Sequence, residues 1–188
     1  MKVYVFRHGQ TYYNQNGWFT GWKDSTLTPL GIKQAKIIAK KLRNKKFDIA
    51  FYTRLSRSKD TLREVLKYHP ECKKLIKDDR MIERGYGNLE GKHHSTVIKK
   101  YGQEQYDSWH RGFRTRPPRG ESFADVEKRV KSFLDDLIRL MKKEKVNVAI
   151  SAHGNSIRLF RKIMEKASEK ETVKWSIPFD TYFEYTIN

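Results

Sequence analysis

Residues 3–9, VYVFRHG, join a short run of β-branched and aromatic residues to an arginine, a histidine and a glycine. The apolar run predicts a buried strand over Val3–Phe6 that stops abruptly at Arg7. A second stretch has the same form, because Val146–Ser151 (VNVAIS) is followed by Ala152-His153-Gly154. The sequence therefore predicts two strands that each end close to a His-Gly pair.

The segments around these two strands alternate between helix and strand patterns. Thr28-Pro29 is typical of a helix start, and apolar residues then recur at helical spacing from Ile32 to Leu42. Further helices are expected over about 56–68, 95–112, 123–143 and 156–166, with a short one capped by Ser168 and Glu171, and strands over 48–52 and 181–187. Residues 10–28 and 78–91 are predicted to be loops. This alternation favours an α/β fold, a three-layer α/β/α sandwich with a mainly parallel central sheet, as a single domain over residues 1–188.

The chain is strongly basic, with 40 Lys and Arg against 22 Asp and Glu and a net charge of +18. A field of that size attracts polyanions, so an RNA-binding protein is one alternative. The ring-rich loop from Tyr12 to Trp22 could likewise stack nucleic-acid bases. However, lysines such as Lys40 and Lys41 fall on solvent-facing positions of predicted helices, which favours an ordinary solvated surface. Nucleic acid is therefore not the expected primary ligand.

Other features of the sequence indicate the cellular compartment of the protein. The apolar run at the start is too short for a signal peptide, and no later segment has the apolar length of a membrane span. Cys72 is the lone cysteine and cannot form an internal disulfide. These observations predict a cytoplasmic enzyme without membrane contact.

His8 and His153 both lie just past the carboxyl end of a predicted strand, which is where ligands bind in open α/β sheets. We therefore expect the two imidazoles to face each other in one pocket. A neutral imidazole accepts a phosphoryl group when a backbone carbonyl holds one ring nitrogen and the other nitrogen is free. Arg7 offers a guanidinium fork for phosphate oxygens, and Gly9 allows close approach of the backbone.

The two motifs around these histidines resemble those of the histidine phosphatase superfamily. Within it, the sequence is most similar to the short 2,3-bisphosphoglycerate-dependent phosphoglycerate mutases. The matching residues occur in order along nearly the whole chain: Asn14, Phe19-Thr20-Gly21-Trp22, Glu83-Arg84-Gly85-Tyr86-Gly87, Lys100-Tyr101-Gly102, Trp109, Arg111-Gly112-Phe113, Pro117-Pro118, Gly120-Glu121-Ser122 and Ile177-Pro178. The resemblance implies a phosphoglycerate mutase-like fold and an isomerase of glycolysis that interconverts 3- and 2-phosphoglycerate.

The resemblance also implies catalytic roles. His8 becomes phosphorylated, while Arg7, Arg57 and His153 hold the transferring phosphoryl group. Glu83 is the general acid and base that exchanges a proton with the substrate hydroxyl. Spacing alone would make Arg57 a surface arginine and Glu83 an ion-pair residue.

Further matched positions are expected to bind phosphate or substrate: Asn14, Thr20, Gly21, Arg84, Tyr86, Arg111, Gly154 and Asn155. The ligand would be a phosphorylated small molecule, with 2,3-bisphosphoglycerate as the primer that first phosphorylates the enzyme. No metal is implied. The family resemblance suggests a homodimer, whereas the short chain leaves a monomer open.

Two substrate-binding positions depart from the mutase pattern. His94 stands where the mutases have a lysine, and His110 where they have the first of two arginines. A histidine gives up a permanent cation and makes binding more dependent on pH, unless both are ordinary exposed residues. The sequence also stops at Asn188 without the tail of longer mutases, which is expected to open the pocket to water. These features support a second hypothesis, a phosphomonoester hydrolase that uses the same catalytic residues.

Overall fold

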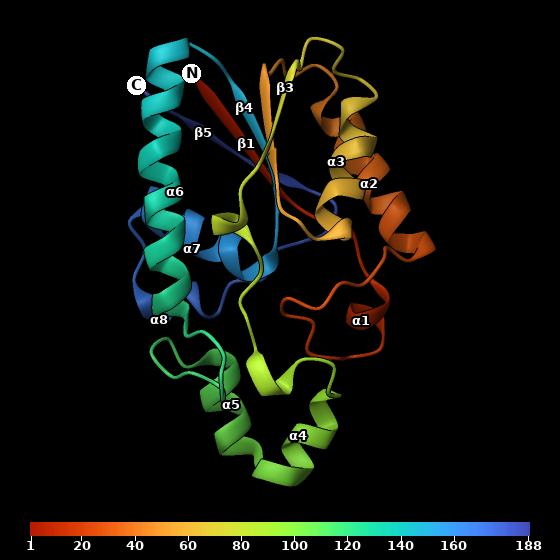
Figure 1. Ribbon diagram of the computed structural model, residues 1–188, viewed down its shortest axis with the longest axis vertical. Coiled ribbons are helices and arrows are strands. Elements are labelled where there is room, and N and C mark those ends of the chain that lie inside the picture. The colour runs from red at the N-terminus through yellow and green to blue at the C-terminus, as the bar shows by residue number, and fades with distance from the viewer.

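A five-stranded sheet in the order β3-β2-β4-β1-β5 forms the centre of the computed structural model, which describes residues 1–188 (Figure 1). Its strands are β1 (Lys2–Arg7), β2 (Ile49–Tyr52), β3 (Lys74–Lys77), β4 (Val148–Ala152) and β5 (Tyr182–Thr186). Neighbouring strands are parallel except β5, which pairs antiparallel with β1. The mainly parallel sheet expected from the sequence is therefore confirmed.

Helices cover both faces of the sheet (Figure 1). One face carries α2 (Pro29–Leu42) and α3 (Ser56–Leu66), and the other carries α6 (Phe123–Glu144) and α7 (Gly154–Glu165). The side chains of β1 point alternately to the two faces of the sheet, and this explains the layers. Val3 and Val5 join the core under α6 and α7, whereas Tyr4 and Phe6 join the core under α2 and α3. The result is the three-layer sandwich predicted from the sequence.

Local capping chemistry sets the helix starts. The Thr28 side chain accepts a hydrogen bond from the first turn of α2. Ser122 and Asp125 form a reciprocal capping box at the start of α6, and Ser168 and Glu171 form another at α8 (Glu169–Thr172). All three starts agree with the sequence prediction.

Three local predictions are wrong. Residues 10–28 are not all loop, because Thr11 caps the short helix α1 (Tyr12–Gln15). The sequence pattern also misses β3, whose four residues begin and end in lysine, as suits an edge strand. The helix expected over 95–112 is two helices, α4 (His94–Tyr101) and α5 (Gln103–Arg111). They are separated by Gly102, whose φ of 81° a side chain would resist.

One residue of the expected apolar stripe of α2 also differs. Ile32 is 41% exposed, whereas Ala35 and Ile38 are fully buried. The buried stripe begins instead at Gly31, which packs against the loop after β1.

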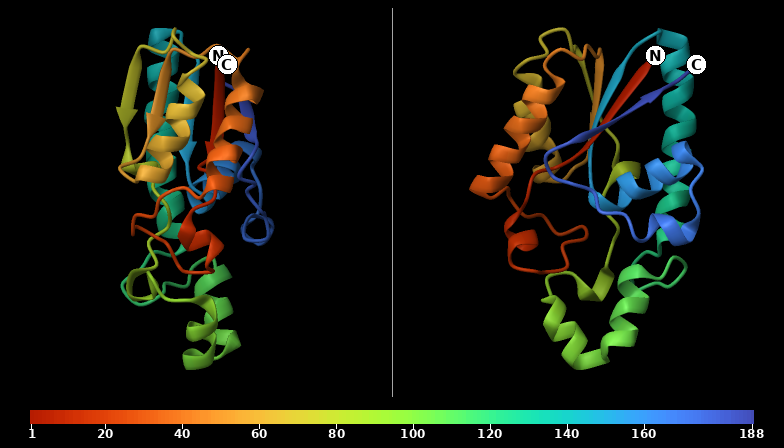
Figure 2. Two further views of the ribbon diagram at one scale, coloured as in Figure 1. Left: turned by 90° about the vertical axis from the view of Figure 1, so that its right-hand side faces the viewer. Right: turned by 180° about the vertical axis from the view of Figure 1, so that it is seen from behind.

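Helices α4 and α5, together called the cap, project beyond the carboxyl ends of the parallel strands (Figures 1 and 2). The two chain termini lie at the opposite end of the sheet, and α1 lies on the same side as the cap. The 3-10 turns η1 (Asp79–Met81) and η2 (Gly87–Leu89) lead from β3 into the cap. The cap thus covers the sheet edge where the sequence predicts the site. None of the helices is long and apolar enough to span a membrane.

Candidate active site

His8 and His153 face each other because their strands are neighbours. β1 and β4 pair in parallel with Arg7 opposite Ala152, so the residue after each strand enters the same space. The His8 backbone N–H extends this ladder by donating to the Ala152 carbonyl at 3.1 Å. The two ring centroids lie 5.0 Å apart, so the two imidazoles face each other, as the sequence predicts.

The His8 ring is held in one tautomer. Its Nδ1 lies 2.7 Å from the Gly9 carbonyl oxygen, which can only accept, so Nδ1 carries the proton and Nε2 keeps a lone pair. Burial lowers the pKa of His8 well below 6.5, and the nearby charges of Arg57 and Arg7 act in the same direction. His8 is therefore a neutral imidazole with a nucleophilic Nε2 at physiological pH.

Gly9 makes this arrangement possible by its lack of a side chain. A Cβ atom at Gly9 would lie 2.1 Å from the Gly31 carbonyl oxygen at the start of α2. Its backbone N–H donates to the Thr61 side chain of α3 at 3.1 Å. The expected close approach of the backbone at Gly9 is therefore to α2 and α3. These contacts hold the loop that carries His8 in place.

Arg7 reaches the site from the end of β1. Its Nη1 donates to the Ile177 carbonyl at 2.8 Å, and its guanidinium lies 3.8 Å from the centre of the Phe179 ring. Its Nε–H is buried without a partner in the protein. Burial lowers the pKa of Arg7 to about 10, so the side chain is still a cation at neutral pH.

Arg57 lies in the first turn of α3 and is 1% exposed. Its Nη2 donates to the Gly21 carbonyl at 2.8 Å, and its Nη1 donates to the Lys23 carbonyl at 2.9 Å. Like Arg7, it has a buried Nε–H without a partner. Arg57 is therefore not the surface residue that spacing alone would suggest.

His153 supplies a third unpartnered nitrogen. Its Nε2 lies 2.8 Å from the Thr53 hydroxyl oxygen, while its Nδ1 is buried without a partner. When the Thr53 hydroxyl donates to Nε2, the ring proton lies on Nδ1. Burial lowers the pKa of His153 well below 6.5, so the ring is neutral. Thr53, which directly follows β2, was not expected from the sequence, although its place after a strand is a usable signal.

We call the four residues His8, Arg7, Arg57 and His153 the phosphoryl cluster. They include three of the four buried side-chain nitrogens in the protein that have no hydrogen-bond partner. Buried N–H groups are costly without an acceptor, and the cost is greater when they belong to cations. The cluster is therefore suited to an anion with several oxygens, such as a phosphoryl group.

Glu83 lies beside the phosphoryl cluster and is 7% exposed. Its Oε1 accepts from the backbone N–H of Arg84 at 2.8 Å and from that of Asn155 at 3.1 Å. The second contact places the carboxylate at the start of α7, where the helix dipole favours negative charge. Oε2 makes no hydrogen bond in the protein, so it is free to exchange a proton with a ligand.

A pocket of about 190 Å³ lies beside these groups and is lined by Arg7 and Glu83, whereas the buried His8, Arg57 and His153 are outside its lining. Its lining includes ten residues that the sequence places in the site: Arg7, Asn14, Thr20, Gly21, Glu83, Tyr86, His94, His110, Gly154 and Asn155. It also includes Trp18, Phe19 and Arg158. Of these, Arg158 has an available sequence signal, because it lies one helical turn after Gly154 and so on the same face of α7.

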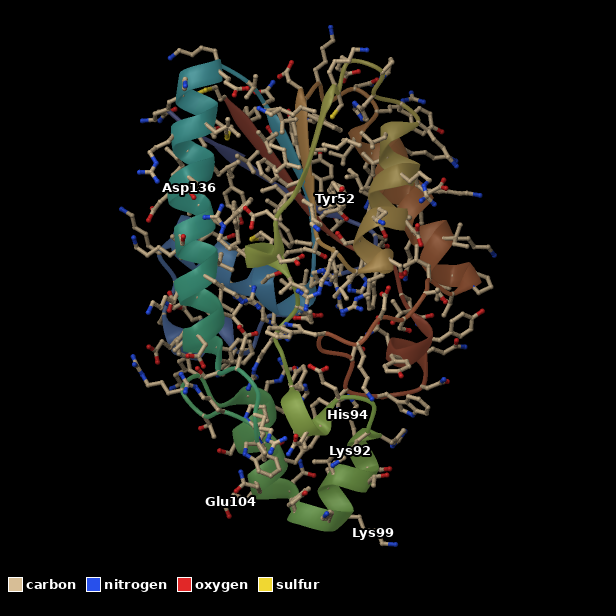
Figure 3. All side chains as sticks on the ribbon, in the orientation of Figure 1. Tyr52, Lys92, His94, Lys99, Glu104 and Asp136 are labelled. Carbon is tan, nitrogen blue, oxygen red and sulfur yellow. The ribbon has the colours of Figure 1, made fainter.

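On the cap side of the pocket, aromatic rings and imidazoles pack together in a group that we call the ring wall: Phe19, Tyr86, His94, Tyr106 and His110. All of them except Tyr106 line the pocket. The centroids of Phe19 and His94 are 4.2 Å apart, and the Tyr106 hydroxyl lies 3.1 Å from Nδ1 of His94. Figure 3 shows His94 at the end of the cap nearest the sheet, with Lys99 and Glu104 at its far end. His94 is therefore not an ordinary exposed histidine.

Both histidines of the ring wall are neutral. Burial lowers the pKa of His110 to about 3, with a further contribution from the positive charge of Arg111. Burial also lowers the pKa of His94 below 6.5. Neither ring supplies the positive charge that lysine or arginine would give at these positions.

Two residues expected to bind substrate lie outside the pocket lining. Arg84 is fully buried, and it donates to the carbonyls of Glu121 at 2.6 Å and Trp109 at 2.8 Å. Arg111 is exposed, and its Nη1 donates to the Val173 carbonyl at 3.0 Å. In this structure both guanidinium groups hold backbone segments.

Fold and site together define a class, the α/β enzymes that hold a histidine nucleophile at the carboxyl ends of a parallel sheet. The chain belongs to the histidine phosphatase superfamily (branch 1), whose family model matches residues 3–182.

Its relatives bear the names of both mutases and phosphatases. The chain is 38% identical over 173 residues to the phosphoglycerate mutase of Schizosaccharomyces pombe, which covers 89% of this chain and 81% of that protein. It is 37% identical over 189 residues to the 2,3-bisphosphoglycerate-dependent phosphoglycerate mutase of Rhizobium meliloti, covering 98% of this chain and 89% of that one. The solved α-ribazole phosphatase from Shigella flexneri superposes with a TM-score of 0.85 at 25% identity, covering 100% of this chain and 91% of that one.

Proposed function

We propose that the chain is a 2,3-bisphosphoglycerate-dependent phosphoglycerate mutase that interconverts 3- and 2-phosphoglycerate through a phosphohistidine at His8. The observation that carries the proposal is the state of His8, whose Nδ1 is held by the Gly9 carbonyl while the neutral ring keeps its Nε2 lone pair. The choice of substrate is supported by mutase-named relatives that are 37–38% identical to this chain over most of its length.

In the proposed reaction, His8 already carries a phosphoryl group when 3-phosphoglycerate binds. The free hydroxyl oxygen of the substrate attacks that phosphorus atom, the N–P bond to His8 breaks, and Glu83 takes the hydroxyl proton. Nε2 of His8 then attacks the other phosphate of the doubly phosphorylated glycerate, and Glu83 returns its proton to the oxygen that departs as this P–O bond breaks. Arg7, Arg57 and His153 offset the charge on the equatorial oxygens.

The same residues fit a bisphosphate primer, because Arg7 and Arg57 carry buried Nε–H groups that lack an acceptor in the protein. When bound, 2,3-bisphosphoglycerate supplies the first phosphoryl group to His8. Asn14 lines the pocket and is a further donor for its phosphate oxygens.

A phosphomonoester hydrolase is the second candidate. It is supported by the neutral His94 and His110 in the ring wall and by the phosphatase name of the Shigella flexneri structure. In that reaction, water takes the phosphoryl group from His8, and Glu83 removes the proton of the water.

The test is a coupled assay of conversion of 3- to 2-phosphoglycerate, with and without 2,3-bisphosphoglycerate, run beside phosphate release. We expect conversion that the primer stimulates and that outpaces phosphate release. His8→Ala should lower both rates by at least about 10⁴-fold, because it removes the nucleophile. His93→Asn, an exposed position where asparagine keeps the cap of α4, is the matched control and should behave like the wild type. Phosphate release without conversion would overturn the mutase in favour of the hydrolase.

A further inference from the structure

We propose that Arg158 binds the carboxylate of the substrate and thereby restricts the enzyme to phosphate esters that carry a second anionic group. The inference rests on the proposed function, because it names the substrate class of the same site. It assigns the specificity to a residue of α7, outside the cap.

The charges of the pocket lining single out Arg158. Arg7 and Arg158 are the only lysine or arginine residues in that lining. Arg7 belongs to the phosphoryl cluster, whereas His94 and His110 are neutral. Burial lowers the pKa of Arg158 to about 10, so it is still charged at neutral pH. Arg158 is therefore the one permanent cation available to a part of the ligand outside the transferred phosphoryl group.

The guanidinium of Arg158 is held before any ligand binds. Its Nε donates to the Trp175 carbonyl at 2.8 Å, and its Nη1 donates to Oδ1 of Asn155. Its Nη2 makes no hydrogen bond in the protein, so this is the nitrogen that a ligand in the pocket can reach. A guanidinium held in this way loses little entropy on binding, and a bond from it to a carboxylate is charge-assisted.

Arg158 also explains how a mutase-like site retains a cation after two substitutions. The ring wall has histidine where the mutase pattern has lysine and arginine, and the remaining arginines of this region, Arg84 and Arg111, lie outside the pocket lining. A carboxylate placed against neutral rings alone would lose its hydration without an opposite charge. Arg158 supplies that charge.

The experiment compares two ligands that differ at the carboxylate alone. These are D-3-phosphoglycerate and sn-glycerol 1-phosphate, which has the same configuration at C2 and a CH₂OH group in place of the carboxylate. Dissociation constants are measured by calorimetry for the wild type, Arg158→Gln and Arg158→Lys. Arg114→Gln is the matched control, because it removes one positive charge from a side chain that is 77% exposed and outside the pocket.

We expect the wild type and Arg114→Gln to prefer 3-phosphoglycerate by at least about tenfold, the effect of one charge-assisted hydrogen bond. Arg158→Gln should weaken the binding of 3-phosphoglycerate by about 10- to 30-fold and that of sn-glycerol 1-phosphate by less than about 3-fold. Arg158→Lys keeps the charge and should recover part of the preference.

Two results would overturn the proposal. Equal weakening of both ligands would mean that Arg158 only positions Asn155, whose backbone N–H donates to Glu83. A wild type without preference would mean that the pocket has no carboxylate subsite. Because binding requires no turnover, these results are independent of whether the protein is a mutase. If Arg158→Gln loses the preference for 3-phosphoglycerate but the wild type does not convert that ligand, the proposed function is wrong and the carboxylate site stands.

Discussion

Arg7 of the phosphoryl cluster lines the same pocket as most of the ring wall, but different parts of the chain hold the two groups of residues in place. The cluster is fixed by the main chain, since His8 extends the β1–β4 ladder and Arg57 donates to the carbonyls of Gly21 and Lys23. The ring wall is fixed by contacts between side chains, such as the tilted contact of Phe19 and His94, whose ring centroids lie 4.2 Å apart. A substitution in the wall therefore leaves the backbone of the cluster in place. The chemistry can be retained while the choice of substrate changes.

After His8, Glu83 gives the largest expected effect, because it acts directly on the reacting oxygen. Glu83→Gln keeps an oxygen that accepts from the backbone N–H groups of Arg84 and Asn155 but cannot donate a carboxyl proton. We expect the kcat for 3-phosphoglycerate to fall by about 10²- to 10³-fold. Phosphorylation of His8 by p-nitrophenyl phosphate, whose leaving group needs no proton, should fall by less than about 5-fold. Equal losses with both substrates would mean that Glu83 only shapes the site.

Arg84 tests how the ring wall is anchored. It donates to the carbonyls of Glu121, Trp109, His110 and Thr115 and so ties the end of the cap to the start of α6. Arg84→Gln leaves several of these buried acceptors without a donor. We expect the free energy of unfolding, measured with urea, to fall by about 3 kcal/mol.

The exposed Arg114 provides the control for that measurement, since Arg114→Gln should change the unfolding free energy by no more than about 0.5 kcal/mol. The resemblance to the mutases assigns Arg84 to the substrate instead. If that role is the main one, kcat/KM for 3-phosphoglycerate will drop in Arg84→Gln while the unfolding free energy stays at the wild-type value.

Local sequence patterns predict Arg7, His8 and His153 of the phosphoryl cluster, whereas Arg57 is predicted only by the resemblance to the mutases. His8 and His153 each follow an apolar run that could only be a buried strand, and parallel strands end at one edge. The start of α6 is predicted for a similar reason, because Ser122 and Asp125 satisfy the first turn of the helix from within four residues. Interactions between residues close in sequence, and patterns that repeat at a regular spacing, can be predicted before the fold is known.

The sequence does not reveal what depends on burial between distant segments. Whether His110 is charged depends on how the cap packs against the loop that carries Phe19, some 90 residues earlier. Likewise, Arg84 reads as a substrate ligand until the structure shows the carbonyls around it. Helical spacing from Gly154 could have placed Arg158 on the site face of α7, but only the pocket lining shows that it is the cation that remains for the substrate. Gly102 could have marked the break between α4 and α5, since glycine commonly ends a helix.

The neutral ring wall predicts a specific dependence of stability on pH. The folded pKa of His110 is about 3, below its ordinary value of 6.5, so the unfolded chain takes up a proton first as the pH falls. The stability contributed by the neutral ring is complete above pH 6.5 and is lost as the pH falls toward 3. Between pH 7 and pH 5, the free energy of unfolding of the wild type should fall by roughly 1–2 kcal/mol more than that of His110→Gln. His110→Phe, which keeps a neutral ring but cannot titrate, should show the same reduced dependence in urea titrations at the two pH values.

His8 and His153 act in the same direction, so part of the dependence will persist in both variants. If both variants lose as much stability as the wild type over this range, His110 is not buried as a neutral ring, and the ring wall is not the uncharged side of the pocket.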